Sequence, residues 1–276
     1  MPELPEVELV ARALDKLVTG RSIVQAELLR ERLVPNLKPR SFVRSVSPAR
    51  VNFVHRRGKH VLFDLDNGFT LLAHLRMSGR FSLLTAASTD PKFTHAVLYF
   101  DDETRLVFDD QRHFGLMKIV KTSELNDAKE IKKLAPEPFS DDFSMGYLTA
   151  ALKTSKRSLK EFLLDQTKVC GLGNIYAAEA MFGAQVHPGT AANKVSRRKV
   201  EPLYHAIRDV LRIAIAHAEG LPVNPEDLEG GYFSGTGEAW MVYDREGSPC
   251  RNCGTPISRT RQAGRSTYFC RRCQRK

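Results

Sequence analysis

The sequence predicts an α+β multidomain protein, with an N-terminal β-sandwich and a flanking helix, then a helical domain and a small C-terminal metal-binding module. Three observations lead to this prediction. Short β-rich runs fill residues 22–120, helical periodicity follows from residue 145 onward, and two Cys-x2-Cys pairs close the chain. A length of 276 residues is enough for more than one core. We expect three segments, 1–134, 135–220 and 221–276.

The composition excludes several classes of protein. With 42% hydrophobic and 27% charged residues, the chain is neither collagen-like, nor disordered, nor a disulfide miniprotein. It contains no apolar run near the roughly 20 residues that a membrane-spanning helix needs, and it does not begin with the basic-then-apolar order of a signal peptide. We therefore expect a cytoplasmic protein.

Basic residues gather at the C-terminal end. The chain carries 42 Lys and Arg against 32 Asp and Glu, a formal net charge of +10. Residues 250–276 contain no Asp or Glu and eight basic residues: Arg251, Arg259, Arg261, Arg265, Arg271, Arg272, Arg275 and Lys276. Such a block favours a polyanionic partner, of which nucleic acid is the commonest.

Four of the five cysteines have the spacing of a zinc site. The set C-x2-C-x16-C-x2-C lets two knuckles converge on one tetrahedral Zn²⁺, with no open position left for chemistry, so the predicted zinc is structural. A pair of disulfides is the alternative, which a cytoplasmic location disfavours. The fifth, Cys170, lies in an apolar stretch and reads as a buried small side chain rather than a nucleophile. The four predicted ligands are Cys250, Cys253, Cys270 and Cys273.

The N-terminal segment begins with an amphipathic helix. Apolar residues recur at helical spacing from Val7 to Val18, and Gly20 follows as a stop. Short strands come next, with a hairpin signal at residues 66–68 (Asp-Asn-Gly) between the runs 61–65 and 69–73. Further runs at 96–100, 105–108 and 116–120 complete the predicted sandwich.

The middle segment reads as helical after a Pro- and acid-rich boundary at 134–142. We expect helices over 145–165, 175–182 and 196–217. Between the first two lies Gly-Leu-Gly-Asn, residues 171–174, a tight turn whose N–H groups open a helix and form a ready phosphate site.

The last segment starts with residues 220–237, which hold five glycines and two prolines and which we expect to be a mobile loop. Between the cysteine pairs, strands over 257–261 and 266–269 would form a hairpin that carries Arg265 to its surface.

The N-terminus suggests a reaction. Removal of Met1 before a small second residue would leave a secondary amine on Pro2, with Glu3 and Glu6 close by. An α-amino group titrates near 8, so a fraction is nucleophilic at neutral pH, and its natural target is an electrophilic carbon that can become an imine.

These features together resemble the formamidopyrimidine-DNA glycosylase (Fpg, or MutM) family. The resemblance rests on PELPEVE at 2–8, RRGK at 56–59, HLRMSG at 74–79, GLGNIY at 171–176 and the terminal cysteines, in that family's order over essentially the whole chain. It implies a β-sandwich domain, a helix-two-turns-helix domain and a zinc finger, acting as a monomer on double-stranded DNA that contains a damaged base or an abasic site. It also implies a bacterial, nucleoid-associated repair enzyme.

The resemblance implies a bifunctional glycosylase and AP lyase. Pro2 would attack C1′ of the damaged nucleotide and form a Schiff base that permits β,δ-elimination, and Glu3 would be its acid–base partner. Glu6 would order the N-terminus, although a favourable acid in the first helical turn explains it equally well. Lys59 would contact the DNA phosphates at the lesion.

The family also extrudes its target nucleotide and fills the gap. Met77, Arg112 and Phe114 match the family's intercalating residues, although Met77 and Phe114 would otherwise be taken for core residues. Asn174 and Arg265 match residues that clamp the phosphates around the flipped nucleotide. Tyr243 is a weaker match, because a core tyrosine explains it as well.

Two departures from the family concern the substrate. His113 stands where many relatives have a second arginine, and the predicted lesion-facing loop 220–240 lacks the usual threonine- and serine-rich opening. We expect excision of oxidised purines such as 8-oxoguanine and formamidopyrimidines. The alternatives are an endonuclease VIII-like enzyme for oxidised pyrimidines, a non-catalytic binder of damaged DNA, and a zinc-ribbon RNA-binding factor.

Overall fold

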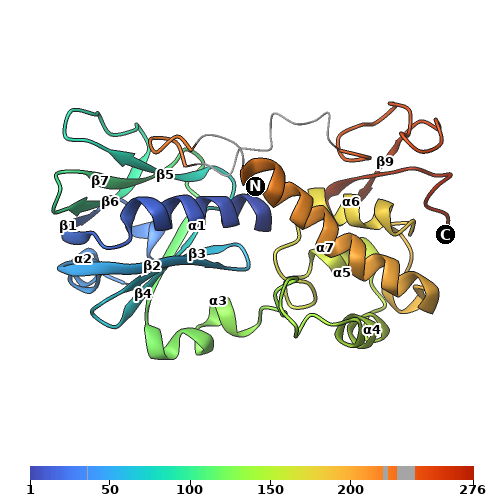
Figure 1. Cartoon of the computed structure of the whole chain (residues 1–276), viewed down its shortest axis with the longest axis horizontal. Coiled ribbons are helices and arrows are strands. Elements are labelled where there is room, and N and C mark those ends of the chain that lie inside the picture. The colour runs from blue at the N-terminus through green and yellow to red at the C-terminus, as the bar shows by residue number, and fades with distance from the viewer. Residues whose placement is uncertain (36, 220–222, 229–239) are drawn as a thin grey trace. The chain divides into compact units, whose positions relative to one another are not determined.

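The computed structural model describes residues 1–35, 37–219, 223–228 and 240–276 (Figure 1). These residues form two compact units. Unit 1 comprises 1–132 with the described part of 217–232, and unit 2 comprises 133–216 with the described part of 233–276. The three-segment division predicted above remains our proposal for the domain organisation.

Unit 1 is built on eight antiparallel strands in the order β5-β7-β6-β1-β2-β3-β4-β8. The hairpin predicted at residues 66–68 joins β3 to β4, as expected. The strands are β1 (Ser22–Leu28), β2 (Ala49–Arg57), β3 (His60–Leu65), β4 (Phe69–His74), β5 (Gly79–Leu84), β6 (Thr94–Phe100), β7 (Arg105–Asp110) and β8 (Leu116–Lys121).

The eight strands fold into two layers. Only two residue pairs join β1 to β2, so the sheet divides there into the halves β5-β7-β6-β1 and β2-β3-β4-β8. Phe63 of β3 meets Phe81 of β5, with ring centroids 5.4 Å apart, although these strands are not neighbours in the sheet. Phe81 in turn contacts Phe108 of β7 at 5.1 Å. The aromatic core between the halves confirms the predicted β-sandwich.

Helix α1 (Leu4–Val18) packs against β2 and β3 and buries its apolar face (Figure 1). Pro5 is compatible with the first turn, because its missing N–H has no partner there in any helix. Helix α2 (Pro39–Val46) was not predicted, although Phe42 and Val46 are spaced to bury one face. The short helices η1 (Glu31–Leu33), η2 (Thr122–Asp127) and α3 (Lys129–Lys132) complete the unit.

Unit 2 differs from the prediction in its first helix. The expected helix over 145–165 is two helices, α4 (Met145–Lys153) and α5 (Leu159–Leu164). The break follows from Ser158, whose hydroxyl accepts from the N–H of Glu161 while the Glu161 carboxylate accepts from the N–H of Ser158, so a new helix begins there. Further along the chain come α6 (Asn174–Gly183), η3 (Ala192–Lys194) and α7 (Arg197–Glu219).

The C-terminal hairpin consists of β9 (Ser258–Gln262) and β10 (Arg265–Phe269). Its two-residue turn has Ala263 at φ 47° and Gly264 at φ 76°, the double left-handed conformation of a tight hairpin. Arg265 therefore belongs to β10 and pairs with Gln262. The strand begins at residue 265, one position before the predicted start at residue 266.

Within the described residues, no helix is long and apolar enough to cross a membrane. The predicted mobile loop 220–237 lies largely outside the described residues. Its described part, 223–228, lies beside β5 of the sandwich, because the N–H of Leu228 donates to the carbonyl of Phe81 at 2.8 Å.

Candidate functional site

The N-terminus of α1 carries two buried carboxylates beside Pro2. Glu3 caps the helix and is only 3% exposed, and Glu6 is 4% exposed. The N–H of Glu3 donates to Oε2 of Glu6 at 2.7 Å, within a capping box that the two residues form. Because this box satisfies helix-terminal N–H groups, the backbone next to Pro2 is held in one conformation.

The β2–β3 hairpin brings Lys59 into the same unit. Gly58 and Lys59 form its two-residue turn, and Gly58 has the left-handed φ of 59°. Nε of Arg56 meets Oε2 of Glu8 at 2.8 Å, which ties this hairpin to α1. Lys59 is 6% exposed, an unusual value for a lysine at a hairpin turn.

Burial by itself would raise the pKa of Glu8, but the charges and hydrogen bonds of Arg56 and Arg12 together outweigh it and hold the pKa below its usual value. Glu8 therefore stays ionised, and the tie between the helix and the hairpin is charge-assisted.

Two loops expose the residues predicted to intercalate. Met77, on the β4–β5 loop, is 45% exposed, and Phe114, on the β7–β8 loop, is 56% exposed. The guanidinium carbon of Arg112 lies 5.5 Å from the centroid of the Phe114 ring. Large apolar side chains left this open suit insertion into another molecule better than a core role.

One buried carboxylate joins the two loops. Asp110 accepts from Oγ of Ser78 at 2.5 Å and from the N–H groups of Arg112 and Gly115 at 3.2 and 2.6 Å. Burial opposes ionisation, yet these hydrogen bonds prevail and lower the pKa of Asp110. Nothing in the sequence pointed to this role for Asp110.

Close packing requires glycine at two positions beside these loops. A Cβ added to Gly79 would lie 2.5 Å from the carbonyl oxygen of Leu75 and 2.8 Å from the Phe108 ring. One added to Gly115 would lie 2.8 Å from the same ring. Both loops therefore rest on Phe108 through residues that have no side chain.

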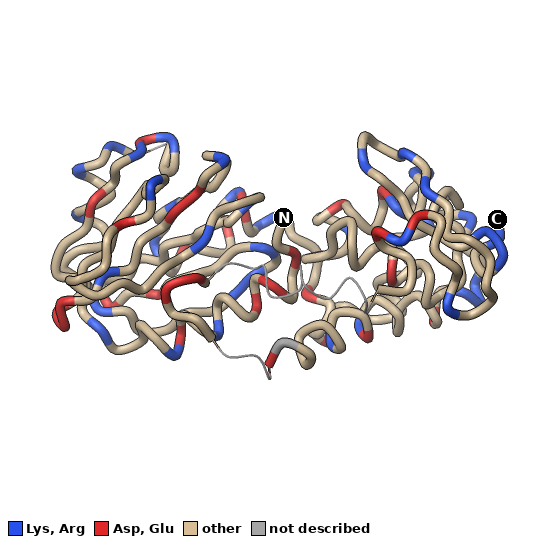
Figure 2. Tube along the Cα trace, turned by 90° about the horizontal axis from the view of Figure 1, so that it is seen from above, with Lys and Arg blue, Asp and Glu red and all other residues tan. Residues whose placement is uncertain are grey.

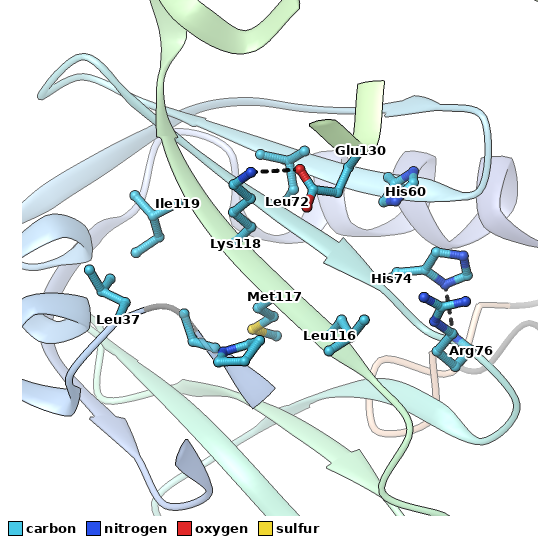
Figure 3. Close-up of a pocket in the computed structure, with 12 residues that line it drawn as sticks. Leu37, His60, Leu72, His74, Arg76, Leu116, Met117, Lys118, Ile119 and Glu130 are labelled. Carbon is cyan, nitrogen blue, oxygen red and sulfur yellow. Dashed lines mark hydrogen bonds and ion pairs between the residues drawn. The ribbon is translucent and has the colours of Figure 1, made fainter. Parts of the chain in front are cut away.

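A pocket of about 270 Å³ lies in unit 1, lined by neither Pro2 nor Glu3 (Figure 3). His60, His74 and Arg76 line one part of it, and an ion pair of 2.7 Å between Lys118 and Glu130 lines another (Figure 3). Burial is the main cause that lowers the pKa of His60 to about 4 and that of His74 to about 2. Both rings are therefore neutral at pH 7.

In unit 2 the predicted phosphate turn is held by one side chain. Gln166 accepts from the N–H of Gly171 at 2.9 Å and donates to the carbonyl of Leu172 at 2.8 Å. Asn174 then begins α6, and its buried Oδ1 has no hydrogen-bond partner among the described residues. Oδ1 is an acceptor and cannot bind an anion, so the groups here that suit a phosphate are the side-chain NH2 of Asn174 and the N–H groups at the start of the helix.

Lys160 supports the strand that carries Arg265. It is 1% exposed, and its Nζ donates to the carbonyl of Ser266 and to Oγ1 of Thr267, both at 2.6 Å. Burial, together with the charge of Arg265, lowers the pKa of Lys160 to about 8. Sequence reasoning missed this residue, because a lysine on a short helix usually faces solvent.

Glu179 holds the segment that contains Tyr243. Its carboxylate accepts three backbone N–H bonds, from Met241, Val242 and Tyr243, at 2.9, 3.0 and 2.9 Å. Burial outweighs these bonds and raises the pKa of Glu179. The Tyr243 ring meets Tyr268 at 5.3 Å, so part of this side chain belongs to the core of the C-terminal module.

The four predicted ligand cysteines come together. Their Sγ atoms all lie within 4.8 Å of one another, with 3.9 Å between Cys250 and Cys273 and 3.5 Å between Cys253 and Cys270. Four thiolates about 2.3 Å from one tetrahedral zinc lie about 3.8 Å apart, so the set fits that ion. Cys170 is buried and lies outside the cluster, as expected.

The basic residues of the C-terminal segment also lie close together in the structure. Figure 2 shows Lys and Arg gathered along the zinc-finger hairpin and the last residues of the chain. Arg259, Arg261 and Arg265 are exposed on β9 and β10. Each unit thus presents its own set of residues suited to a polyanion.

Comparison with known families gives the identity of the fold. Three family models match: the formamidopyrimidine-DNA glycosylase N-terminal domain over 1–117, the formamidopyrimidine-DNA glycosylase H2TH domain over 134–223, and the zinc finger found in FPG and IleRS over 247–275. The chain belongs to the formamidopyrimidine-DNA glycosylase family. It is therefore a member of a family of glycosylase/AP lyase enzymes of base excision repair, and its cysteine cluster is the site of one structural zinc.

Individual relatives support this membership over the full length. The formamidopyrimidine-DNA glycosylase of Listeria innocua is 38% identical over 275 residues and covers 100% of both chains. A Lactococcus lactis Fpg variant in complex with Fapy-dG-containing DNA has a TM-score of 0.91 at 32% identity, with 100% of each chain covered. The wild-type Lactococcus lactis enzyme with DNA that contains an oxidised pyrimidine has a TM-score of 0.90 at 31% identity, also with 100% of each chain covered.

Proposed function

We propose that this protein is a bifunctional DNA glycosylase and AP lyase that excises oxidised purines, 8-oxoguanine and formamidopyrimidines, through a Schiff base on Pro2. The observation that carries the proposal is the start of α1, where Pro2 is followed by the almost fully buried carboxylate of Glu3. A nucleophile next to a desolvated acid–base group is the arrangement that such chemistry requires.

Base excision and strand cleavage begin once Met1 has been removed. The Pro2 nitrogen attacks C1′ and gives up its proton, and the base leaves with the electrons of the glycosidic bond and takes up one proton, so the two transfers balance. Glu3 gives a proton to the sugar ring oxygen, the C1′–O4′ bond opens, and an iminium ion forms between Pro2 and C1′. Loss of a C2′ proton then expels the 3′ phosphate, a second elimination expels the 5′ phosphate, and water releases the sugar fragment from Pro2.

The exposed loops of unit 1 serve nucleotide extrusion. Met77 and Phe114 insert into the base stack, and Arg112 hydrogen-bonds the base left without its partner. Unstacking costs a few kcal/mol per step, which the inserted side chains partly offset. Support comes from the exposure of both apolar side chains and from the Asp110 network that joins their loops.

Three residues bind the DNA phosphates: Lys59 in unit 1, and Asn174 and Arg265 in unit 2. Asn174 begins a helix whose preceding turn is fixed by Gln166, and Arg265 stands on a strand that Lys160 supports. Helix N-termini and arginine side chains are common phosphate ligands in protein–DNA interfaces. Zinc would hold the hairpin that carries Arg265.

The relatives named above leave the lesion range open, because Lactococcus lactis Fpg was crystallised both with Fapy-dG and with an oxidised pyrimidine. We place this chain on the purine branch because of its PELPEVE start. We further propose that it acts as a monomer on cytoplasmic, nucleoid DNA; its curated relatives include bacterial enzymes.

A gel assay tests the substrate and the nucleophile together. Duplexes carrying 8-oxoguanine, thymine glycol or an abasic site are incubated with the wild-type protein and with Pro2→Gly. The proposal predicts β,δ-elimination products from 8-oxoguanine and from the abasic site, and no products from the variant. Cleavage of the thymine glycol and abasic-site duplexes but not of the 8-oxoguanine duplex would favour the pyrimidine enzyme, and no cleavage of any duplex would favour a non-catalytic binder.

A further inference from the structure

The loop between β7 and β8 has strained backbone at its centre. His113 has φ 61°, a left-handed conformation that costs a residue with a Cβ roughly 1 kcal/mol or more. The ends of the loop are fixed by Asp110, which binds the N–H groups of Arg112 and Gly115. The strained centre therefore needs an interaction of its own to persist.

That interaction is a contact between two histidines. Nδ1 of His113 lies 3.0 Å from Nε2 of His95, and the two rings are nearly parallel, at 17°, with centroids 5.1 Å apart. The Phe93 ring meets the His113 ring edge-on at 5.7 Å. The His113 ring is thus stacked, bordered and hydrogen-bonded, although the residue as a whole is exposed.

His95 is a rigid anchor for this contact. It is 4% exposed on β6 and packs on the Phe108 ring at 6.4 Å. Its carbonyl accepts the N–H groups of Leu29 and Arg30. Since His95 cannot move without disturbing the sandwich, a ring bound to it is held in place.

We propose that His113 is a positioning residue, which binds His95 and so fixes the loop that presents Arg112 and Phe114. The two neighbours of His113 in this loop are Arg112 and Phe114, and the guanidinium carbon of Arg112 lies 5.5 Å from the centroid of the Phe114 ring. The effect on DNA repair rests on the proposed function, whereas the effect on the loop does not.

The contact also sets a protonation requirement. One ring nitrogen must donate and the other must accept. The hydrogen bond between the two rings therefore forms when both rings are neutral or when one is an imidazolium, and it is lost when both are imidazolium ions. Asp109, Asp110 and Arg30 are the charged groups that act on His95, together with His113 itself, and burial is the main cause that lowers the pKa of His95. At neutral pH the hydrogen bond is therefore intact.

Three variants and one control test the proposal. His113→Gly relieves the backbone strain but removes the ring, His95→Phe keeps His113 but removes its partner, and His113→Asn keeps a polar side chain that tolerates positive φ. Gln111→Ala, an exposed change in the same loop, is the control. Hydrogen exchange of the Arg112 and Gly115 amides is measured on the protein without DNA.

We expect exchange about three- to tenfold faster in His113→Gly and in His95→Phe, the equivalent of one net hydrogen bond, with partial rescue in His113→Asn and no change in Gln111→Ala. Wild-type exchange in both His113→Gly and His95→Phe would overturn the proposal, even if the wild-type protein repairs DNA. In the excision assay, His113→Gly should raise KM for the 8-oxoguanine duplex more than it lowers kcat. Inactivity of the wild-type protein would count against the proposed function, and the exchange result would still stand.

Discussion

Glu3 is the residue on which the proposed chemistry depends most. Its side chain is desolvated at the start of α1, and its backbone N–H is already bound to Glu6. The position is therefore fixed by local helix geometry, and a substitution that keeps the shape of the side chain should change chemistry more than structure.

Glu3→Gln should bind damaged DNA nearly as well as the wild-type protein and excise 8-oxoguanine about 100-fold more slowly or worse, the loss expected for a general acid–base group. Single-turnover excision and fluorescence anisotropy measure the two quantities. Glu31→Gln, an exposed carboxamide substitution in the same unit, should change neither. Near-normal excision by Glu3→Gln would remove Glu3 from the reaction.

Lys160→Met should weaken DNA binding through Arg265. The change leaves the carbonyl of Ser266 and the hydroxyl of Thr267 without their donor, which costs about 1–3 kcal/mol of unfolding free energy. Lys156→Met, an exposed lysine nearby, serves as the control. Equal binding by the two variants would contradict a supporting role for Lys160.

The sequence leads to proposals for the residues that carry the chemistry, but it gives no indication of the residues that hold them in position. Pro2 and Glu3 are adjacent, and the two cysteines of each Cys-x2-Cys pair are three positions apart, so short stretches of sequence are enough to suggest them. Lys160 and Ser266 are 106 positions apart, and Asp110 and Ser78 are 32 apart. Contacts over such separations arise from the tertiary fold, so local pattern carries no signal for them.

At the scale of elements, the two exposed loops of unit 1 depend on glycines that touch Phe108. Gly115→Ala should lower the free energy of unfolding by about 1–3 kcal/mol, because the new Cβ would overlap the Phe108 ring. Urea unfolding measures the change. Gly146→Ala, where the nearest atom is Oγ of Ser144 at 3.6 Å, should be neutral or stabilising. A Gly115→Ala protein as stable as the wild type would show that the packing argument is wrong.

The zinc finger is the second element with a clear test. Cys253→Ala should abolish zinc binding and, with the hairpin released, most DNA binding. Cys170→Ala removes a buried thiol outside the cluster and should keep one zinc per chain. Metal analysis and anisotropy decide the point; retained DNA affinity in a zinc-free Cys253→Ala protein would contradict the role given to the hairpin.

The break between α4 and α5 was open to prediction. Ser158 and Glu161 form the Ser-x-x-Glu capping signal, which marks a helix start inside the run that apolar periodicity joined into one helix. Helix α2 was missed for a different reason. It has only eight residues, which is too short for helical periodicity to be distinguished from the neighbouring strand patterns.

At the scale of the whole molecule, the sandwich followed from many short apolar runs with turn signals between them. The pairing order did not, because β1 lies between β6 and β2 and β8 pairs with β4, partners far apart in the chain. Strand order depends on how two sheet faces bury each other, which residue periodicity alone does not contain.

His60 and His74, the half-buried histidines that line the pocket of unit 1, should make the protein less stable in acid. Their native pKa values, about 4 for His60 and about 2 for His74, lie below the value near 6.5 expected for the unfolded chain. Between these values the unfolded state binds more protons, so the free energy of unfolding falls as pH falls below about 6.5. From pH 7 to pH 5 each histidine should cost on the order of 2 kcal/mol.

Urea unfolding at pH 7 and pH 5 measures this loss. His60→Phe should lose less stability between the two values than the wild type, whereas His205→Phe, a change at an exposed histidine, should behave like the wild type. An unaltered pH dependence in His60→Phe would show that the pKa of His60 is not lowered in the folded protein.

Borohydride trapping on a duplex with one 8-oxoguanine opposite cytosine, followed by peptide mass mapping, tests the central claim most directly. The account predicts a covalent adduct on Pro2 of the protein that has lost Met1, and none with Pro2→Gly. An adduct on another residue would contradict the assigned nucleophile. An adduct with an abasic site but not with 8-oxoguanine would contradict the purine substrate, and no adduct with either duplex would contradict the Schiff-base mechanism itself.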